Sequence, residues 1–148
     1  MNKSQWQIVL TLVFVIGIIL TACSGGARTL EGDTRDAVLA YAEPMADTLL
    51  NGLFAGDYTT FATDFDEAMR KGLDEKAFTD LRQMLESRLG AFQSREVSSV
   101  LESGNYYIVV YRLRFEKDDA VTMRLVLTKT EPHLVSGLWF DSPELRKR

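Results

Sequence analysis

Thiols, imidazoles and prolines are scarce in this sequence of 148 residues, which holds one cysteine, one histidine and three prolines. A single thiol cannot form a disulfide within the chain, so the burial of apolar side chains has to stabilise the fold. The lone histidine, His133, cannot build a multi-histidine metal site. We therefore predict no metal and no cofactor.

An excess of basic residues is also missing, since 17 lysines and arginines face 21 aspartates and glutamates and the formal net charge is −4. A nucleic-acid surface needs clustered cations that displace counterions from the phosphates. No such stripe occurs in the sequence. Nucleic acid is therefore not an expected partner.

A long apolar run is missing too, because the one near the amino terminus, Ile8–Leu20, is thirteen residues with a threonine and a glycine inside it. A membrane-spanning helix needs about 20 mostly apolar residues. Lys3 precedes the run and small residues follow it, which is the pattern of a removable signal. We expect residues 1–22 to be a signal peptide. The alternative is an uncleaved, tilted helix from about Trp6 to Ala22.

The end of this segment, Leu20-Thr21-Ala22-Cys23, resembles a bacterial lipobox. The resemblance implies that the Cys23 sulfur receives a diacylglycerol, that a peptidase cuts before Cys23, and that the new amino terminus is acylated with a fatty chain such as palmitate. In this family pattern Ser24, in place of aspartate, permits sorting to an outer membrane. The expected location is the extracytoplasmic side of the cell membrane or of an outer membrane, with the membrane as a partner through Cys23.

Composition divides the rest of the chain into three parts. Residues 23–32 are the lipidated cysteine and a short, glycine-bearing stretch without an apolar period, which we expect to be a flexible tether. Residues 33–142 carry the periodic patterns of one folded domain. Residues 143–148 form a basic carboxyl-terminal tail.

The first half of the domain has helical periodicity. From Asp33 or Thr34 onward, apolar residues recur at steps of three and four, which marks one face of a helix. That face consists of Val38, Ala42, Met45, Leu49 and Leu53. Pro44 lies inside this helix and is expected to kink it or to begin a second segment.

Two further helices are predicted from their ends. Asp57 can cap a short second helix, and Asp74 can cap a third helix over Glu75–Leu89. Gly90 follows this third helix at the position where a glycine commonly ends one.

The second half of the domain switches to a period of two, which is typical of a strand with one wet face. One face carries Tyr107, Val109, Tyr111, Leu113 and Phe115, and the other carries Tyr106, Ile108, Val110, Arg112 and Arg114. Turn residues predict antiparallel neighbours over residues 95–101 and 121–129 and a last strand over residues 134–140. This order predicts an α+β fold in which amino-terminal helices pack on a curled antiparallel sheet of four strands.

Three segments, in this order, carry a resemblance to known proteins. They are Leu53-Phe54-Ala55-Gly56-Asp57-Tyr58 between helices, Leu89-Gly90-Ala91-Phe92 after the third helix, and Val135-Ser136-Gly137-Leu138-Trp139-Phe140 in the last strand. Over residues 36–141 the chain resembles the cone-shaped superfamily of nuclear transport factor two, SnoaL and ketosteroid isomerase, and within it a group of bacterial secreted and lipid-anchored domains of unknown function. The resemblance implies a cone whose mouth holds a small molecule or whose outer sheet face pairs with another subunit. It does not imply a reaction.

Aromatic and basic residues supply the candidate binding sites. Tyr58, Phe61, Tyr107 and Tyr111 are candidates for lining a ligand pocket, although aromatic residues at strand spacing also pack in cores. Arg112, Arg114 and Arg124 are expected on one face of the sheet. They form either a solvated surface or a docking face for an acidic partner or a second subunit.

No catalytic residue is assigned. In the isomerases of the resembled superfamily, a buried carboxylate takes a proton while a tyrosine and a second acid bind the oxyanion. The more apolar strand face carries no acid, and Asp57, Asp64 and Asp66 are expected near helix ends, where capping accounts for them. His133 follows Pro132 in a turn and is expected to be exposed.

The sequence thus favours a lipid-anchored extracytoplasmic domain that binds a small apolar ligand or an envelope protein without catalysing a reaction. Two alternatives stay open: an isomerase- or cyclase-type enzyme that uses a pocket acid and a tyrosine, and a homodimeric structural adaptor of the cell envelope that pairs through its sheet. An enclosed cavity with a carboxylate within hydrogen-bond reach of a tyrosine would favour the enzyme. A filled cone would favour binding through the outer face.

Overall fold

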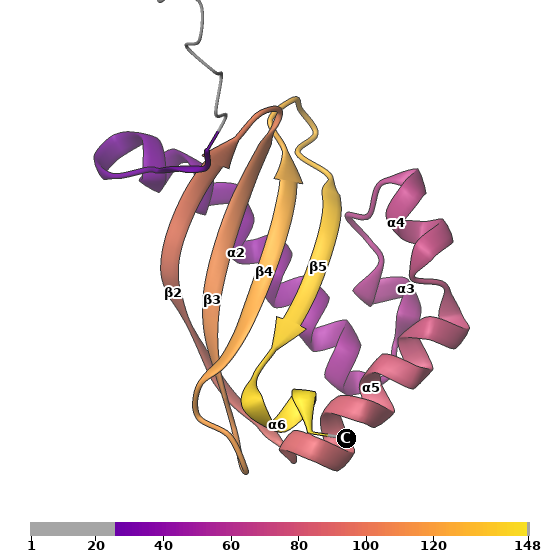
Figure 1. The fold of residues 1–148 in the computed structure, drawn as a ribbon. Helices are drawn as coiled ribbons and strands as arrows, with labels where there is room; N and C mark the ends of the chain where they lie inside the picture. Colours follow the sequence, from indigo (N-terminus) through magenta and orange to yellow (C-terminus); the bar gives the residue numbers. More distant parts are fainter. Residues whose placement is uncertain (1–25, 148) are drawn as a thin grey trace, which may run out of the picture.

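The computed structural model describes residues 26–147, so the expected signal peptide, the lipobox residues Leu20, Thr21 and Ala22, and Cys23 lie outside the described residues. Within this range the chain is an α+β fold in which helices are followed by an antiparallel sheet (Figure 1). The elements are β1 (Arg28–Thr29), α2 (Gly32–Ala55), α3 (Tyr58–Phe61), α4 (Glu67–Gly72), α5 (Glu75–Leu89), β2 (Phe92–Ser103), β3 (Tyr106–Phe115), β4 (Val121–Thr128), β5 (Val135–Asp141) and α6 (Pro143–Arg146).

The sheet has five strands in the order β1-β2-β3-β4-β5, and the prediction of four strands was therefore wrong. The additional strand, β1, pairs with the end of β2. Leu30, directly after it, is buried, and its amide donates to the Val100 carbonyl at 2.8 Å. Two residues are too few to show a period of two, so the strand escaped the pattern analysis. Residues 28–30, assigned to a flexible tether, belong to the folded domain.

Helix α2 is one continuous element although Pro44 lies inside it, and the predicted start of a second segment at Pro44 was wrong. Proline removes one amide donor from the helix. The apolar face of α2 continues on both sides of Pro44, and the helix packs behind the strands as one element (Figure 1). The buried residues of α2 are Val38, Ala42, Ala46, Leu49, Leu50, Gly52 and Leu53.

Aspartate side chains begin α3, α4 and α5. Asp57, Asp66 and Asp74 each accept a hydrogen bond from the backbone amide three residues further on, at 3.2, 2.8 and 2.9 Å. These bonds satisfy amides that have no partner within the helix. The caps predicted at Asp57 and Asp74 are confirmed, and Asp66 begins a helix that the pattern did not separate from its neighbours.

Helices α2 and α3 approach each other backbone to backbone at Gly52. A Cβ atom at this position would lie 2.2 Å from the Phe61 amide nitrogen and 2.9 Å from the Asp57 carbonyl oxygen. Only a residue without a side chain fits such a contact. Gly52 therefore allows the chain to turn sharply between α2 and α3, and this turn brings the aromatic side chains of α3 into the core.

The carboxyl-terminal residues fold back onto α5 rather than extending away. The Nη1 atom of Arg88 donates to the carbonyl oxygens of Glu144 and Leu145, at 3.3 and 3.2 Å. Ser142 caps α6 by accepting from the Leu145 amide. Over residues 26–147, none of the helices is both long enough and apolar enough to cross a bilayer.

Candidate functional site

The inner face of the sheet, which is turned toward α2, is filled by core side chains. Of the four aromatic residues considered for a pocket, Phe61 and Tyr111 are buried and Tyr58 and Tyr107 are partly buried against the core. The Phe61 ring lies 4.9 Å from the ring of Phe78, and the Tyr58 hydroxyl donates to the Leu73 carbonyl at 3.0 Å. These four residues thus have packing partners within the domain.

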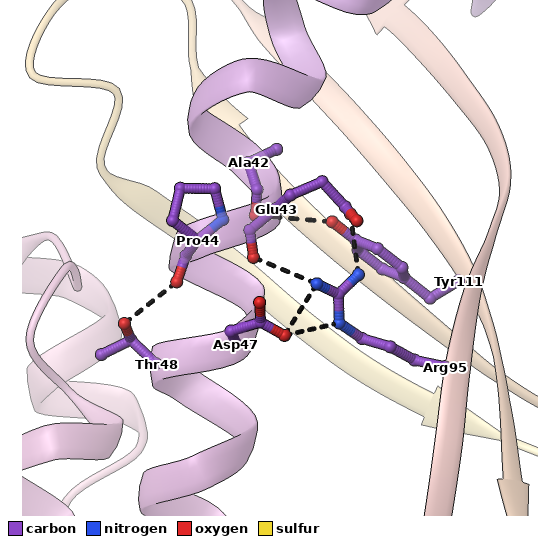
Figure 2. A network of polar contacts seen from close by, with 7 residues as sticks. All are labelled: Ala42, Glu43, Pro44, Asp47, Thr48, Arg95 and Tyr111. Carbon is purple, nitrogen blue, oxygen red and sulfur yellow. Dashed lines mark hydrogen bonds and ion pairs between the residues drawn. The ribbon is translucent and has the colours of Figure 1, made fainter.

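A largely buried arginine links the inner face to α2 (Figure 2). The side chain of Arg95, on β2, is 12% exposed and donates to Glu43 Oε1 at 2.7 Å and to Asp47 Oδ1 at 2.8 Å. Its Nη2 also donates to the Glu43 carbonyl at 3.2 Å. Burial by itself lowers the pKa of Arg95, but the hydrogen bonds to the two carboxylates raise it above its usual value. The guanidinium therefore stays charged and fastens the helix to the sheet.

Tyr111 lies beside this ion pair. Its hydroxyl donates to the Ala42 carbonyl at 3.5 Å, and the Arg95 guanidinium lies 5.1 Å from the centre of its ring. Burial, followed by the negative charge of Glu43, raises the pKa of Tyr111 well above its usual range. A tyrosine and an acid are thus close together, as the enzyme alternative requires. However, Glu43 is engaged by Arg95, and an ion-paired carboxylate is a weak general base.

A second polar cluster lies where the β4–β5 connection meets α2. The ring of His133 stacks on Tyr41 with 4.0 Å between centroids, and its Nδ1 lies 3.1 Å from the Thr128 carbonyl oxygen. His133 is partly buried, so the prediction that it is exposed was wrong. The pattern could not show this, because the ring is covered by a helix almost 100 residues away in the chain.

The hydroxyl of Tyr41 is buried and has no hydrogen-bond partner among the described residues. Burial, and next the nearby Tyr107, raises the pKa of Tyr41 to about 12. Tyr107 lies under the Lys129 ammonium, which is 5.3 Å from its ring centre. Lys129 and Arg28 both pair with Glu102, and these bonds hold the pKa of that carboxyl below its usual value.

Three hollows in the described part of the chain open to the outside of the domain instead of lying under the sheet. The first, of about 430 Å³, lies at the β3–β4 turn and α6 and includes Asp118 and Pro143. The second, of about 210 Å³, lies between Gly56 and α5. The third, of about 460 Å³, lies beside Phe54 and Phe92. None of them contains one of the predicted pocket residues.

The outer face of the sheet consists of the side chains of β2–β5 that point away from α2, and it is turned to the reader in Figure 1. Trp139 is 57% exposed there and Tyr106 is 44% exposed. Partly buried aliphatic side chains lie between them, from Ile108, Val110 and Val126. An exposed tryptophan on an aliphatic surface is typical of a contact site.

Three arginines lie beside this apolar centre, on the side of the β3–β4 turn. The structure places Arg112, Arg114 and Arg124 on the outer face, as the alternation predicts, and all three are exposed. Within residues 26–147 none of them forms an ion pair within 4.0 Å, and Arg112 donates only to the Asp119 carbonyl at 3.2 Å. The acids of this face are Glu96 and Asp141, and Asp141 is paired with Arg146. The outer face is therefore positive on an acidic chain.

The acids considered for catalysis have structural partners or lie at chain turns. Asp66 accepts from the Ser136 hydroxyl at 2.6 Å as well as from its cap amide, and these bonds hold the pKa of Asp66 below its usual value. The side-chain and backbone bonds from Thr60 lower the pKa of Asp57 in the same way. Asp64 accepts the Val135 amide through its backbone carbonyl at 2.8 Å. No cluster of three or more potential metal ligands occurs among residues 26–147.

Fold and surface together define an α+β domain with a filled interior and an uncovered, aromatic and basic sheet face. Residues 46–131 match the family model described as protein of unknown function (DUF3887). The match covers more than half of the chain, which therefore belongs to this family. No curated protein and no solved structure matches the chain. The matched segment includes β3 and β4 but not Trp139.

The sequence analysis did not identify two important residues of the sheet, Arg95 on its inner face and Trp139 on its outer face. Arg95 occupies an inward position of β2, opposite Leu113, and its partners Glu43 and Asp47 are four residues apart on α2. A charged residue at a core position signals a buried ion pair, but the sequence does not say with which element. Trp139 alternates with Leu138 and Phe140, which pack against the core, and this alternation could have placed it outside.

Proposed function

We propose that this protein is a lipid-anchored, extracytoplasmic binding domain of the bacterial cell envelope that binds through the outer face of its sheet and catalyses no reaction. The observation that carries the proposal is the position of Trp139, which is more than half exposed beside Arg124 on a sheet face that α2 leaves uncovered. Aromatic residues and arginines dominate the energetics of binding sites.

The filled interior favours an envelope partner over a small apolar ligand. Tyr111 and Phe61 are buried among core side chains, and the three hollows described for residues 26–147 include neither of them. The isomerase- or cyclase-type enzyme is disfavoured because the acid and tyrosine that lie close together already have partners. Glu43 is paired with Arg95, and the Tyr111 hydroxyl donates to α2.

The charge of the outer face disfavours the homodimeric adaptor. A two-fold dimer through this face would place the same patch against itself. Arg112, Arg114 and Arg124 of both copies would then lie in one interface, and like charges repel when water is excluded. An acidic partner fits this face better.

The anchor is part of the proposal and rests on Leu20-Thr21-Ala22-Cys23. The lipid chains on Cys23 hold the domain on the extracytoplasmic side of the cell membrane or of an outer membrane. We also propose the wider relationship to the cone-shaped superfamily of nuclear transport factor two, SnoaL and ketosteroid isomerase, which the order of helices before an antiparallel sheet supports. An experimental structure that does not superpose on that superfamily would refute the relationship.

Two experiments on the full chain in bacterial cells test the proposal. In the first, a photo-crosslinking amino acid replaces Trp139, or Lys71 as a control on the exposed surface of α4. Illumination should give adducts from position 139 and none from position 71, and equal yields would contradict binding through the outer face. In the second, Cys23→Ala should leave an unprocessed precursor without fatty-acid label, and normal labelling of this variant would contradict the anchor.

A further inference from the structure

The length of chain between the proposed anchor and the domain limits how far the domain can lie from the membrane. Strand β1 begins at Arg28, so only five residue steps separate it from Cys23, and they span at most about 18 Å when fully extended. Part of that length is used in crossing the lipid headgroups, which are roughly 5–8 Å thick on each side of a bilayer. The start of β1 is therefore held within roughly 10 Å of the headgroup surface.

At this distance the surface charge of a membrane still acts on the protein, because the Debye length is about 8–10 Å at physiological salt. The chain as a whole has a net charge of −4. The outer face is the exception, since it carries Arg112, Arg114 and Arg124, which form no ion pair with the other described residues. An anionic bilayer repels the acidic surfaces and attracts this face, at about 1 kcal/mol for each arginine near the surface.

The apolar part of the outer face fits the same surface. Tryptophan and tyrosine accumulate at the boundary between headgroups and hydrocarbon, where a ring finds an apolar side and a polar side together. Trp139 and Tyr106 are the exposed rings of the outer face. Strand β1 pairs with β2 alongside Leu101, whose neighbour in β3 is Ile108 of the outer face, so the anchor joins the sheet at an edge that borders this face.

We infer that the outer face of the sheet lies on the anionic headgroups of the membrane that holds the lipidated Cys23. This inference rests on the proposed function and names its partner: a phospholipid surface with negative charge. The chain then binds the membrane twice, once through the fatty chains and once through the sheet. The tether keeps the weaker contact of the sheet at high local concentration on the surface that holds the lipid chains.

The chain supplies its own probe for this contact. It has two tryptophans, Trp6 and Trp139, and cleavage before Cys23 removes Trp6. The fluorescence of the mature lipoprotein therefore comes from Trp139 alone. We would purify the mature protein from a bacterial membrane, verify by intact mass that it begins at a lipidated cysteine, and reconstitute it in vesicles of phosphatidylcholine alone or with phosphatidylglycerol.

In vesicles that contain phosphatidylglycerol, brominated lipids should quench most of the Trp139 emission, and quenching by dissolved acrylamide should fall several-fold. Both effects should disappear in phosphatidylcholine vesicles and in about 0.5 M salt, which screens the attraction between exposed charges. They should also disappear in the triple variant Arg112→Glu, Arg114→Glu, Arg124→Glu. The matched control is Lys71→Glu with Lys76→Glu, which reverses two exposed charges on the helices and should leave the quenching unchanged.

Each other outcome overturns the inference in a recognisable way. Trp139 that stays open to acrylamide in every vesicle, and is shielded only in native envelopes, indicates a protein partner. Shielding that is independent of lipid charge and increases with the amount of protein in the vesicle indicates a second copy of the chain. A purified protein without lipid on Cys23 contradicts the proposed anchor, and with it the proposed function, before any quenching is measured.

Discussion

The indole of Trp139 lies over Gly137, two residues earlier on the same strand. A Cβ atom at Gly137 would come within 2.4 Å of the Cη2 and Cζ3 atoms of the indole. The absence of a side chain at Gly137 therefore sets the orientation of the exposed ring, which lies along the sheet and not away from it.

Gly137→Ala should consequently move the indole without unfolding the domain. The new methyl group displaces a ring on the surface, so the free energy of unfolding should change by less than about 1 kcal/mol. The fluorescence anisotropy of Trp139 should fall in the mature protein because the indole loses its contact with the backbone at Gly137 and becomes more mobile. An unchanged anisotropy would show that Gly137 does not determine the ring orientation.

Arg95→Met should destabilise the domain by about 2 kcal/mol, since four hydrogen bonds to carboxylate or carbonyl oxygens of α2 are lost and the partly buried Glu43 keeps no counterion. Urea unfolding measures this change. Arg82→Met is the control, because Arg82 forms a surface pair with Glu86 at 2.8 Å and its loss should cost less than about 0.5 kcal/mol. Arg95→Lys should recover little stability, because an ammonium cannot reproduce the fork of a guanidinium. Equal losses at positions 95 and 82 would refute the role of Arg95 as the link between sheet and helix.

Gly52→Ala and Gly72→Ala should have opposite effects. The first places a methyl group against the backbone of α3, which cannot move as a side chain can, and should cost about 3 kcal/mol or prevent folding. The second meets nothing within 4 Å at the end of α4 and should be neutral or stabilising by up to about 1 kcal/mol. Thermal unfolding followed by circular dichroism compares the two. A tolerated Gly52→Ala would contradict the backbone contact between α2 and α3.

Ser136→Ala should make the stability of the domain less sensitive to acid. The Ser136 hydroxyl is the first cause of the lowered pKa of Asp66. Because this pKa is lower in the folded than in the unfolded state, the stabilisation is complete above the unfolded pKa, near 4, and is lost as the pH falls toward the folded value. The variant should be less stable than the parent protein by about 1 kcal/mol at pH 7, and the difference should shrink below about pH 4. A difference that stays constant down to pH 2.5 would refute the link to Asp66.

The sequence predicted those elements whose apolar pattern extends over many residues or whose ends are marked by a capping residue or a glycine. Helix α5 has apolar residues at helical spacing between Asp74 and Gly90, and β3 alternates over ten residues, so both were recognised. Strand β1 is too short for any period. Continuity of α2 through Pro44 depends on packing against the sheet, which overrides a local preference.

The sequence pointed to the three arginines of the outer face but not to Trp139 beside them, nor to the contacts between distant segments. Alternation is enough to place Arg112 and Arg114 on one strand face, and the register of β4 adds Arg124. No sequence rule shows that Tyr111 is covered by α2, that His133 stacks on Tyr41, or that Arg95 has two acidic partners. These relationships join segments between 48 and 92 residues apart, and only the folded chain brings them together.

The two-residue strand β1 occupies part of the open edge of β2. A clone that started at Gly32 would leave the Val100 carbonyl and the neighbouring backbone groups unpaired, although the hydrophobic core contributed by the helices would be largely retained. Bare strand edges recruit strands from other molecules and promote aggregation. By covering part of this edge, the few residues next to the anchor reduce self-association. A recombinant version of the domain should therefore start upstream of Arg28.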